Sequence, residues 1–444
     1  MKKILTIAGS DSGGGAGIQA DLKTITVLGA YGMSVITALT AQNTQGVRGV
    51  FESSPEFIKL QMDTVLSDIG ADAAKTGMLA SSEIVRTVAQ GVKAHGIKTL
   101  VVDPVMVAAS GDPLLAEEAV DSVKSDLLPL AHTVTPNLSE ASILCGFTVD
   151  SPETMEKAAK AILAMGPRYV LVKGGHLDGS AMDLFYDGQT FTTFESPRID
   201  TIHTHGTGCT LSAALATFLG QGYDPLEAVG RAKRFITRAI AGGLNVGKGK
   251  GPTNPFVEIE RLLERETVLA KMTSALERLL SKPYGRLIPE IRSNLGYAAI
   301  GAESRDDVAA IPGRITQIKD RVVAFAQPAF GASSHVAKVV LAAMRFDPQC
   351  RSAMAIRYES EILAACQKAG FVMAQFDRAD EPKDLKEREG SSLEWGTTTA
   401  IKTLGKVPDA VWDEGEKGKE PVIRILGPDP EAVLEKLDRI YQNL

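Results

Sequence analysis

The sequence predicts an α/β fold in its first half, built on a mostly parallel sheet, and a second α/β or α+β domain after it. Short apolar runs rich in β-forming residues alternate with helical patterns, which is typical of βαβ units. Each run ends in polar or glycine residues, and open α/β sheets bind their ligands beyond the carboxyl ends of such strands. The 444 residues are too many for one compact core, so we expect more than one domain.

The order of elements in the first half follows from these runs. We expect strands over 4–9, 34–40, 99–105, 132–137 and 169–175, and helices over 17–30, 55–69, the residues that follow Cys209, and 224–244. The segment GKGKGPTNP, residues 247–255, combines glycine, lysine and proline without an apolar period, which predicts a loop.

A different pattern begins after this loop. Apolar residues recur at steps of mostly three and four, which predicts one stripe on a long helix: Leu262, Leu269, Met272, Leu276 and Leu279. Further strands are expected over 321–326, 352–358, 371–376, 410–415 and 421–427, with helices over 333–346, 359–370 and 429–442. The sequence therefore predicts two domains, residues 1–255 and 265–444.

Composition excludes several classes of protein. The net charge of −6 argues against nucleic acid as the main partner. The first apolar run is too short for a signal peptide, and no later run is long enough to span a membrane. The 4 cysteines have neither CxxC spacing nor a dense framework, so we expect reduced thiols and a cytoplasmic protein.

A glycine-rich loop, GSDSGGGAGIQADLKT at residues 9–24, follows the first expected strand. It lacks both the dinucleotide-binding spacing G-x-G-x-x-G with a later acid and the G-K-[ST] of a P-loop. Two interpretations remain open. The loop binds a ligand, or it is a flexible turn in which Asp21 is a solvated acid that favours the helix dipole.

Three more strand ends carry chemistry suited to phosphate. Asn137 and Glu140 in TPNLSE suit a water-rich Mg²⁺ site, or equally a helix capping box. Lys173 in LVKGG can reach a nucleotide phosphate, or it is an ordinary edge lysine. The turn THGTGCTLSAAL, residues 204–215, aims backbone N–H groups and a helix dipole at one point. Four such sites together favour phosphoryl transfer.

These stretches, with GAYGMSVITALTAQNT, KTGMLAS and VVDPVMVAASGDPLL, closely resemble one family. It is the hydroxymethylpyrimidine and hydroxymethylpyrimidine-phosphate kinases of thiamine biosynthesis, in the ribokinase superfamily. The resemblance covers residues 1–255. It implies a three-layer α/β/α sandwich and two phosphorylations of 4-amino-5-hydroxymethyl-2-methylpyrimidine with ATP and Mg²⁺, first on the hydroxyl and then on the phosphate.

The resemblance also implies the roles of individual residues. Gln42 is expected to bind the pyrimidine, its amide matching a ring nitrogen and the exocyclic amine. The other expected pocket residues are Gly9, Ala16, Asp21, Met78 and Val105. The expected nucleotide contacts are Asn137, Lys173 and Thr207, and the expected metal ligands are Asn137, Glu140 and Asp103, with Asp112 as a further acid.

Gly206, Gly208 and Cys209 form the expected catalytic turn. Related sugar and vitamin kinases have a proton-accepting aspartate where this family has the thiol. A cysteine at a helix N-terminus has a depressed pKa, so we expect Cys209 to be partly thiolate and to assist the first phosphorylation more than the second. The alternative is that the thiol fills space while the backbone amides of 206–209 do the chemistry.

The second half has candidate phosphate ligands but no glycine phosphate loop. Its histidine, His335, begins an expected helix, where a cap or core role is the commoner one. Arg292, Arg314 and Arg357 stand at expected element ends. Arginine reads phosphate and pyrophosphate through its planar fork, and a solvated surface position is the alternative for each.

This half resembles the ThiN-type thiamine-phosphate synthase domain that is often fused behind such a kinase. The resemblance rests on IPEIRSNLGYA, IPGRI, FGASSHVAKVVLAAMR, MAIRY and a late G-x-D-P. It implies that hydroxymethylpyrimidine diphosphate is joined to a thiazole phosphate with loss of pyrophosphate. Arg314 and His335 match the expected essential pair, and Arg292 and Asn294 are the next substrate-binding candidates.

Other functions stay open at this point. The second domain could sense pathway ligands without catalysis, and the first could be a pyridoxal or other vitamin kinase of the same superfamily. A purely structural protein is disfavoured because the whole set of kinase motifs is present. The expected partners are small-molecule substrates and further copies of the chain in a homo-oligomer, with no nucleic acid and no membrane.

Overall fold

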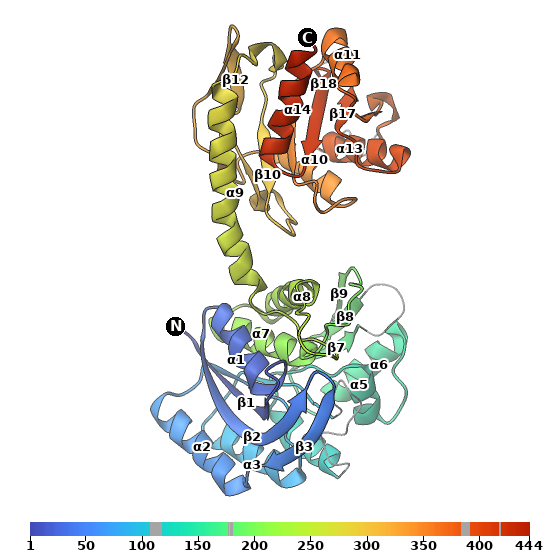
Figure 1. Cartoon of the computed structure of the whole chain (residues 1–444). Coiled ribbons are helices and arrows are strands. Elements are labelled where there is room, and N and C mark those ends of the chain that lie inside the picture. Colours follow the sequence, from blue (N-terminus) through green and yellow to red (C-terminus); the bar gives the residue numbers. More distant parts are fainter. Residues whose placement is uncertain (107–117, 176, 178–180, 383–390, 417–418) are drawn as a thin grey trace. The chain divides into compact units, whose positions relative to one another are not determined.

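The computed structural model describes residues 1–106, 118–175, 177, 181–382, 391–416 and 419–444. The chain divides into two compact units, Met1–Ile259 and Glu260–Leu444 (Figure 1). Each unit is described by itself below. None of the described helices is both long and apolar enough to cross a bilayer.

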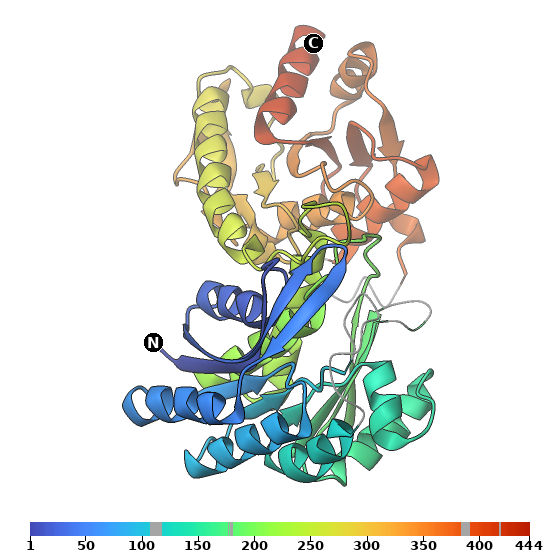
Figure 2. The same ribbon diagram turned by 60° about the horizontal axis from the view of Figure 1, so that its bottom comes forward.

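The first unit is built on a sheet whose described strands run in the order β3-β2-β1-β4-β5-β6-β7-β8-β9. The parallel strands are β1 (Lys3–Asp11), β2 (Tyr31–Asn43), β4 (Ala73–Thr76), β5 (Leu100–Val102), β6 (Thr133–Val134) and β7 (Tyr169–Gly174). The antiparallel strands β3 (Gly46–Glu52), β8 (Ala181–Tyr186) and β9 (Phe191–Ser196) lie at the two edges. Figure 2 shows β2 and β3 as a long hairpin along one edge.

Helices cover both faces of this sheet. One face carries α1 (Gly17–Val27), α7 (Thr207–Gln221) and α8 (Pro225–Ala241). The other carries α2 (Pro55–Asp68), α3 (Ser82–Ala94), the short α4 (Ala119–Ser122), α5 (Leu138–Cys145) and α6 (Pro152–Leu163). In α3 the buried Ile84, Val85, Val88 and Val92 follow the helical period and pack on the sheet. The expected three-layer α/β/α architecture is confirmed.

The second unit contains a mostly antiparallel sheet in the order β14-β11-β10-β15-β18-β17-β16. Its strands are β10 (Leu295–Ala298), β11 (Val308–Ala310), β14 (Ala329–Phe330), β15 (Ser352–Arg357), β16 (Met373–Gln375), β17 (Ala410–Asp413) and β18 (Val422–Gly427). The strands β12 (Ile315–Ile318) and β13 (Arg321–Ala324) form a separate hairpin.

Helices again lie on both faces. α9 (Val257–Leu280), α11 (Ser360–Lys368) and α14 (Pro430–Gln442) pack on one face, and α10 (Ser334–Met344) and α13 (Ser391–Leu404) on the other. The predicted stripe on α9 packs as expected, because Leu269 is partly buried and Met272, Leu276 and Leu279 are buried, whereas Leu262 is exposed.

Candidate functional site

Polar residues at the strand ends of the first unit lie at one edge of its sheet, and of these the sequence singled out Asp103, Asn137 and Lys173 but not Asp11. Asp11 ends β1, Asp103 directly follows β5, Asn137 begins the turn after β6, and Lys173 lies near the end of β7. Because parallel strands share the edge at which their carboxyl ends meet, residues distant in sequence come together there. The structure places Asp103 and Lys173 against the turn that starts α7, and Asn137 pairs with Lys173.

Lys173 is the cation at the centre of this edge. Its Nζ donates to Asp103 Oδ1 at 2.9 Å and lies 4.0 Å from Glu140 Oε2. Burial opposes the ionisation of Asp103, but the ammonium groups of Lys173 and Lys75 together with the hydrogen bonds from Lys173 and Ser212 hold the pKa of Asp103 below its usual value. Burial raises the pKa of Glu140 to about 7, although Lys173 opposes the change. The three side chains form one charge cluster.

Asn137 and Glu140 also form the capping box that the sequence allowed. Asn137 Oδ1 accepts from the Glu140 amide at 2.9 Å, and Glu140 Oε2 accepts from the Asn137 amide at 2.8 Å. Among the described residues no group of three or more His, Cys, Asp or Glu side chains is arranged to hold a metal ion. Two converging carboxylates and an amide oxygen still fit Mg²⁺ that keeps most of its ligands as water and phosphate. Asp112 lies outside the described residues.

The folded-state pKa of Glu140 predicts a pH dependence of stability. In the folded protein its carboxyl keeps its proton up to about pH 7, whereas in the unfolded chain the pKa of Glu140 has its ordinary value of 4.5. Stability from this group is therefore present below pH 4.5 and lost as pH rises to 7, by about 3 kcal/mol at most. In urea unfolding at pH 5, 6, 7 and 8, the free energy of unfolding should decline less with rising pH in Glu140→Gln than in the wild type. Glu153→Gln, at the exposed start of α6, should keep the wild-type decline; equal declines in all three proteins would contradict the assignment.

The turn before α7 has a backbone conformation that suits the anion-binding role expected from the sequence. Gly206 precedes the helix with φ +78°, and a Cβ there would lie 1.9 Å from the carbonyl oxygen of Gly15, so only glycine fits. No side chain caps this end of α7, which leaves N–H groups to face a ligand. A Cβ at Gly208 would lie 3.4 Å from both Asp103 Oδ2 and Lys173 Nζ, so the turn adjoins the charge cluster. Thr207 Oγ1 donates to Thr204 O at 2.7 Å.

The expectation of a thiolate at Cys209 is wrong. Burial raises the pKa of the Cys209 thiol to about 11, although the Lys75 ammonium opposes the change. The carboxylates of Asp21 and Asp103 add to the increase, and the hydrogen bond from the Gly17 amide opposes it. At neutral pH the group is therefore a thiol.

The Asp21 side chain is fully buried, so it is not a solvated acid, and it does not line a ligand pocket as the resemblance implied; the interpretation that the loop binds a ligand is not affected. Asp21 Oδ2 lies 2.9 Å from Lys75 Nζ and accepts a hydrogen bond from Thr6 Oγ1 at 2.6 Å. Burial alone would lower the pKa of Lys75, but Asp21, Cys209 and Asp103 together raise it. Lys75 was missed in the sequence. The available signal was a lysine inside the apolar strand AAKT, because a buried cation needs a partner.

The expected pyrimidine-binding residues lie around the glycine loop. A Cβ at Gly9 would lie 3.3 Å from Met78 Sδ, so these two are neighbours. The Ala16 amide donates to Asp11 Oδ2 at 2.8 Å, and His205 Nε2 lies 3.1 Å from the same oxygen and 3.4 Å from Gln42 Nε2. Val105 is half-buried against the core of the unit. Asp11 and His205 stand in the quoted motifs, but nothing in the sequence singled them out.

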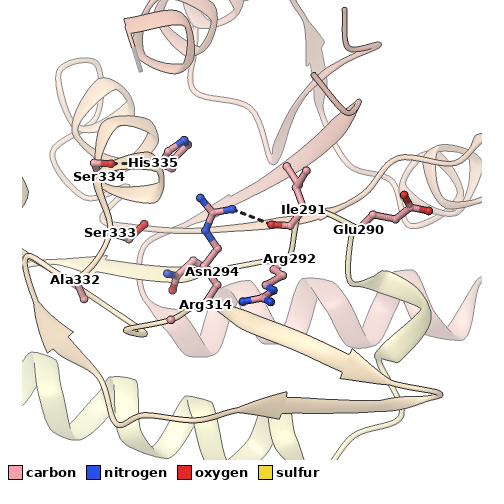
Figure 3. A pocket seen from close by; sticks show the side chains of 10 residues that line it. Glu290, Ile291, Arg292, Asn294, Arg314, Ala332, Ser333, Ser334 and His335 are labelled. Atoms are coloured by element: carbon pink, nitrogen blue, oxygen red, sulfur yellow. Dashed lines mark hydrogen bonds between the residues drawn. The ribbon is translucent and has the colours of Figure 1, made fainter. Parts of the chain in front are cut away.

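The second unit has a pocket of about 530 Å³, within the usual range for small-molecule sites (Figure 3). Its lining residues are Glu290, Ile291, Arg292, Asn294, Gly313, Arg314, Ala332, Ser333, Ser334 and His335. The structure thus brings together all four predicted residues of this half. Arg357 is not among the lining residues; it donates to Ile288 O and pairs with Glu359.

Both arginines of the pocket have a left-handed backbone. The φ angle is +68° at Arg292 and +69° at Arg314, a conformation that costs a non-glycine residue about 1–2 kcal/mol and concentrates at functional sites. Arg314 donates from Nη1 to Ile291 O at 2.8 Å, which leaves most of its fork for a ligand.

Asn294 holds the chain that carries Arg314. It is buried, and its amide bonds both backbone groups of Ile311 at 2.9 Å. Asn294 was expected to bind substrate, but these bonds give it a different role, which is to position the segment that carries Arg314. His335 lies in the first turn of α10, 3.4 Å from Ser334 Oγ, and the N-cap Ser333 makes no side-chain cap bond. The first N–H groups of α10 therefore face the same pocket as the arginines.

Comparison with known proteins identifies both halves of the chain. Residues 11–254 match the family described as phosphomethylpyrimidine kinase, and residues 271–439 match thiamine-phosphate synthase ThiN. Thiamine biosynthesis bifunctional protein ThiED of Geobacter sulfurreducens is 51% identical over 264 residues, which cover 59% of this chain and 54% of that protein. Hydroxymethylpyrimidine/phosphomethylpyrimidine kinase of Streptomyces coelicolor is 51% identical over 251 residues, 56% of this chain and 93% of that kinase. The match thus spans about half of the bifunctional relative.

Solved structures with the same fold include pyridoxal kinases. The Bacillus subtilis pyridoxal kinase, in a complex with ADP, has a TM-score of 0.56 and 42% identity, covering 58% of this chain and 99% of that one. The Staphylococcus aureus pyridoxal kinase, bound to AMP-PCP and pyridoxal, has a TM-score of 0.54 and 39% identity over 57% of this chain and 94% of that one. Both likenesses fall on the first unit and agree with its ribokinase-like fold.

Proposed function

This chain belongs to the phosphomethylpyrimidine kinase family and carries a thiamine-phosphate synthase domain of the ThiN family, and on that premise we propose three successive reactions in one chain. Residues 1–255 phosphorylate 4-amino-5-hydroxymethyl-2-methylpyrimidine to its monophosphate and then to its diphosphate. Residues 265–444 join that diphosphate to a thiazole phosphate and release pyrophosphate. The kinase family implies the use of ATP. The substrates named here and the use of Mg²⁺ are our proposal.

The observation that carries the kinase proposal is the contact between the Gly206–Cys209 turn and the Lys173–Asp103–Glu140 cluster. Phosphoryl transfer has a loose transition state, so its catalysis depends on position and charge more than on a strong base. The turn's N–H groups would stabilise charge on the transferred phosphoryl group, and Lys173 would neutralise the nucleotide phosphates. Asp103, Glu140 and Asn137 would hold Mg²⁺ through its waters, and the ion would neutralise phosphate oxygens.

The synthase proposal depends on the arginine-lined pocket of the second unit. When diphosphate leaves the pyrimidinylmethyl carbon, the bonding electron pair goes with it and the aminopyrimidine ring stabilises the cation. The nitrogen of the thiazole then forms the new carbon–nitrogen bond. Arg292 and Arg314, together with the first turn of α10 and His335, would hold the departing charge.

One coupled assay tests the whole proposal. The full chain is supplied with the unphosphorylated pyrimidine, Mg·ATP and thiazole phosphate, and thiamine phosphate is the expected product. Formation of the pyrimidine diphosphate alone would leave the second unit as a ligand sensor. Because the solved relatives include pyridoxal kinases, turnover of pyridoxal is measured in parallel; faster turnover of pyridoxal than of the pyrimidine would overturn the kinase assignment.

The neutral thiol at Cys209 supports the interpretation that backbone amides act and the thiol fills space. Cys209→Ala should therefore slow the two phosphorylations to a similar extent, by less than about tenfold, because neither step loses a charged group. Single-turnover rates of each step give the comparison, with Cys209→Ser as the variant that retains a polar hydrogen. A loss confined to the first step would restore Cys209 as the acceptor of the hydroxyl proton.

A further inference from the structure

Asp11, His205 and Gln42 form a cluster beside the glycine loop, outside the phosphate machinery. His205 Nε2 is the shared atom: it lies 3.1 Å from Asp11 Oδ2 and 3.4 Å from the amide of Gln42. One ring nitrogen cannot both donate to one neighbour and accept from the other. The hydrogen-bond requirements of the three side chains therefore fix which atoms carry hydrogen.

Asp11 can only accept. Its Oδ1 receives the Gly13 amide at 2.8 Å, and its Oδ2 receives the amides of Gly15 at 3.0 Å and Ala16 at 2.8 Å. Burial would raise the pKa of Asp11, but the bonds from His205, Gly13 and Ala16 together hold it below its usual value. An ionised carboxylate has no hydrogen to give, so the hydrogen between Asp11 and His205 belongs to His205 Nε2.

Gln42 must then turn its oxygen to His205. The structure draws the amide nitrogen toward His205 and the oxygen 3.2 Å from Thr40 Oγ1, but the two ends of an amide have the same shape and are assigned from their partners. The Thr40 hydroxyl already donates to Ser10 O at 3.0 Å, which leaves its oxygen as an acceptor. With the amide oxygen toward His205, the single Nε2–H is shared between Asp11 Oδ2 and that oxygen, and the amide nitrogen donates to Thr40 Oγ1; the opposite orientation would point an amide hydrogen at a ring nitrogen that already carries hydrogen.

We infer that Asp11 and His205 are positioning residues that set substrate specificity by fixing the Gln42 amide in one orientation. The inference rests on the proposed function. The amide then presents an acceptor on the His205 side and a donor on the Thr40 side. An aminopyrimidine offers a matching pair, an exocyclic amine next to a ring nitrogen, and pyridoxal has no amine next to its ring nitrogen. A site with a fixed donor and acceptor rejects a ligand that leaves one of them unpaired.

The position of His205 is itself constrained. Its backbone N–H donates to Gly251 O and its carbonyl accepts from the Thr253 amide, both at 3.1 Å. A Cβ at Gly15 would lie 2.6 Å from His205 Cδ2, so the imidazole packs directly on the glycine loop. The ring is therefore held where it meets both Asp11 and Gln42.

The test compares two substrates in three variants of the full chain. The substrates are the aminopyrimidine alcohol and its analogue with hydrogen in place of the amine. His205→Leu removes the donor, His205→Gln keeps an N–H at the same reach, and His203→Leu makes the same change two residues earlier on the same loop, away from Gln42. In His205→Leu we expect the preference for the amine to fall at least about tenfold, through KM, with kcat within about threefold of the wild type.

His205→Gln and His203→Leu should keep the preference. An equal loss for both substrates in His205→Leu would overturn the inference, since a merely structural role would act that way. Failure of the wild-type chain to phosphorylate either pyrimidine would overturn the proposed function instead. In that case the binding affinities of the two pyrimidines are measured by calorimetry in the same variants. A loss of the preference for the amine in His205→Leu alone would support the inference, and an equal loss of affinity for both would overturn it.

A second measurement does not depend on activity. The chain has 6 histidines, and ¹⁵N-histidine NMR of the wild type beside His205→Gln assigns the ring of His205. We expect hydrogen on Nε2. A ring with hydrogen on Nδ1 alone would overturn the inference, because Nε2 could then only accept.

Discussion

Arg314→Ala is expected to lower the rate of thiamine phosphate formation at least about 100-fold, because it removes a charge-assisted donor for the departing diphosphate. Both kinase steps should be unchanged, since Arg314 lies in the pocket of the second unit. The measurement supplies pyrimidine diphosphate and thiazole phosphate directly and follows the product. Synthase activity within threefold of the wild type would remove Arg314 from the site.

Lys319 provides the matched control for this variant. It is another cation on the same hairpin with a left-handed backbone, φ +56°, and it is not among the residues that line the pocket. Lys319→Ala should leave synthase activity within about threefold. Arg314→Gly should lose synthase activity as Arg314→Ala does. It should unfold at a higher temperature than Arg314→Ala, because glycine adopts a positive φ without the cost of about 1 kcal/mol or more that alanine has there.

Lys75→Met is expected to destabilise the first unit by about 3–5 kcal/mol. The reason is that Asp21, which is fully buried, would lose the ammonium that contacts both of its carboxylate oxygens at 2.9 and 3.1 Å. Urea unfolding of the full chain, followed by a signal from the first unit, measures the loss. The double variant Lys75→Met/Asp21→Asn should recover most of it, because no buried charge is then left unpaired.

An exposed ion pair gives the control for Lys75. Lys59 pairs with Asp63 on the surface of α2, where the side chains are 66% and 41% exposed. The same change, Lys59→Met, should alter the unfolding free energy by about 0.5 kcal/mol or less, because water screens such pairs. Equal effects of the two substitutions would show that burial of the Asp21–Lys75 pair contributes nothing.

Long elements with a clear period could be predicted from the sequence. The five strand runs of the first half each overlap an observed strand, and α1, α2, α8 and α9 fall where apolar spacing placed them. Other strands were missed, both the short β4, β10 and β11 and the longer antiparallel β3, β8 and β9. Such segments become strands because neighbouring strands pair with them, and a local pattern does not carry that information.

Site residues divide in the same way. Asn137, Lys173 and the turn at 206–209 could be found because each lies in a local motif at a strand end. The partners of Lys75 and His205 could not be found in this way, because they lie 54 and 194 residues away along the chain. The state of Cys209 was predicted wrongly for a related reason. Its position at a helix start is local, but the burial that raises the pKa of its thiol to about 11 arises only when the chain folds.

Because Glu140 both caps α5 and belongs to the charge cluster, hydrogen exchange at the Asn137 amide should depend on nucleotide binding. The same carboxylate oxygen accepts a hydrogen bond from the Asn137 backbone amide and lies 4.0 Å from Lys173 Nζ in the charge cluster. It cannot bind the amide and a ligand of the cluster fully at the same time. Loading the enzyme with Mg·ATP would draw that oxygen away and leave the Asn137 amide to exchange with solvent. Deuterium uptake at this one backbone position would then register nucleotide occupancy without any dye or label.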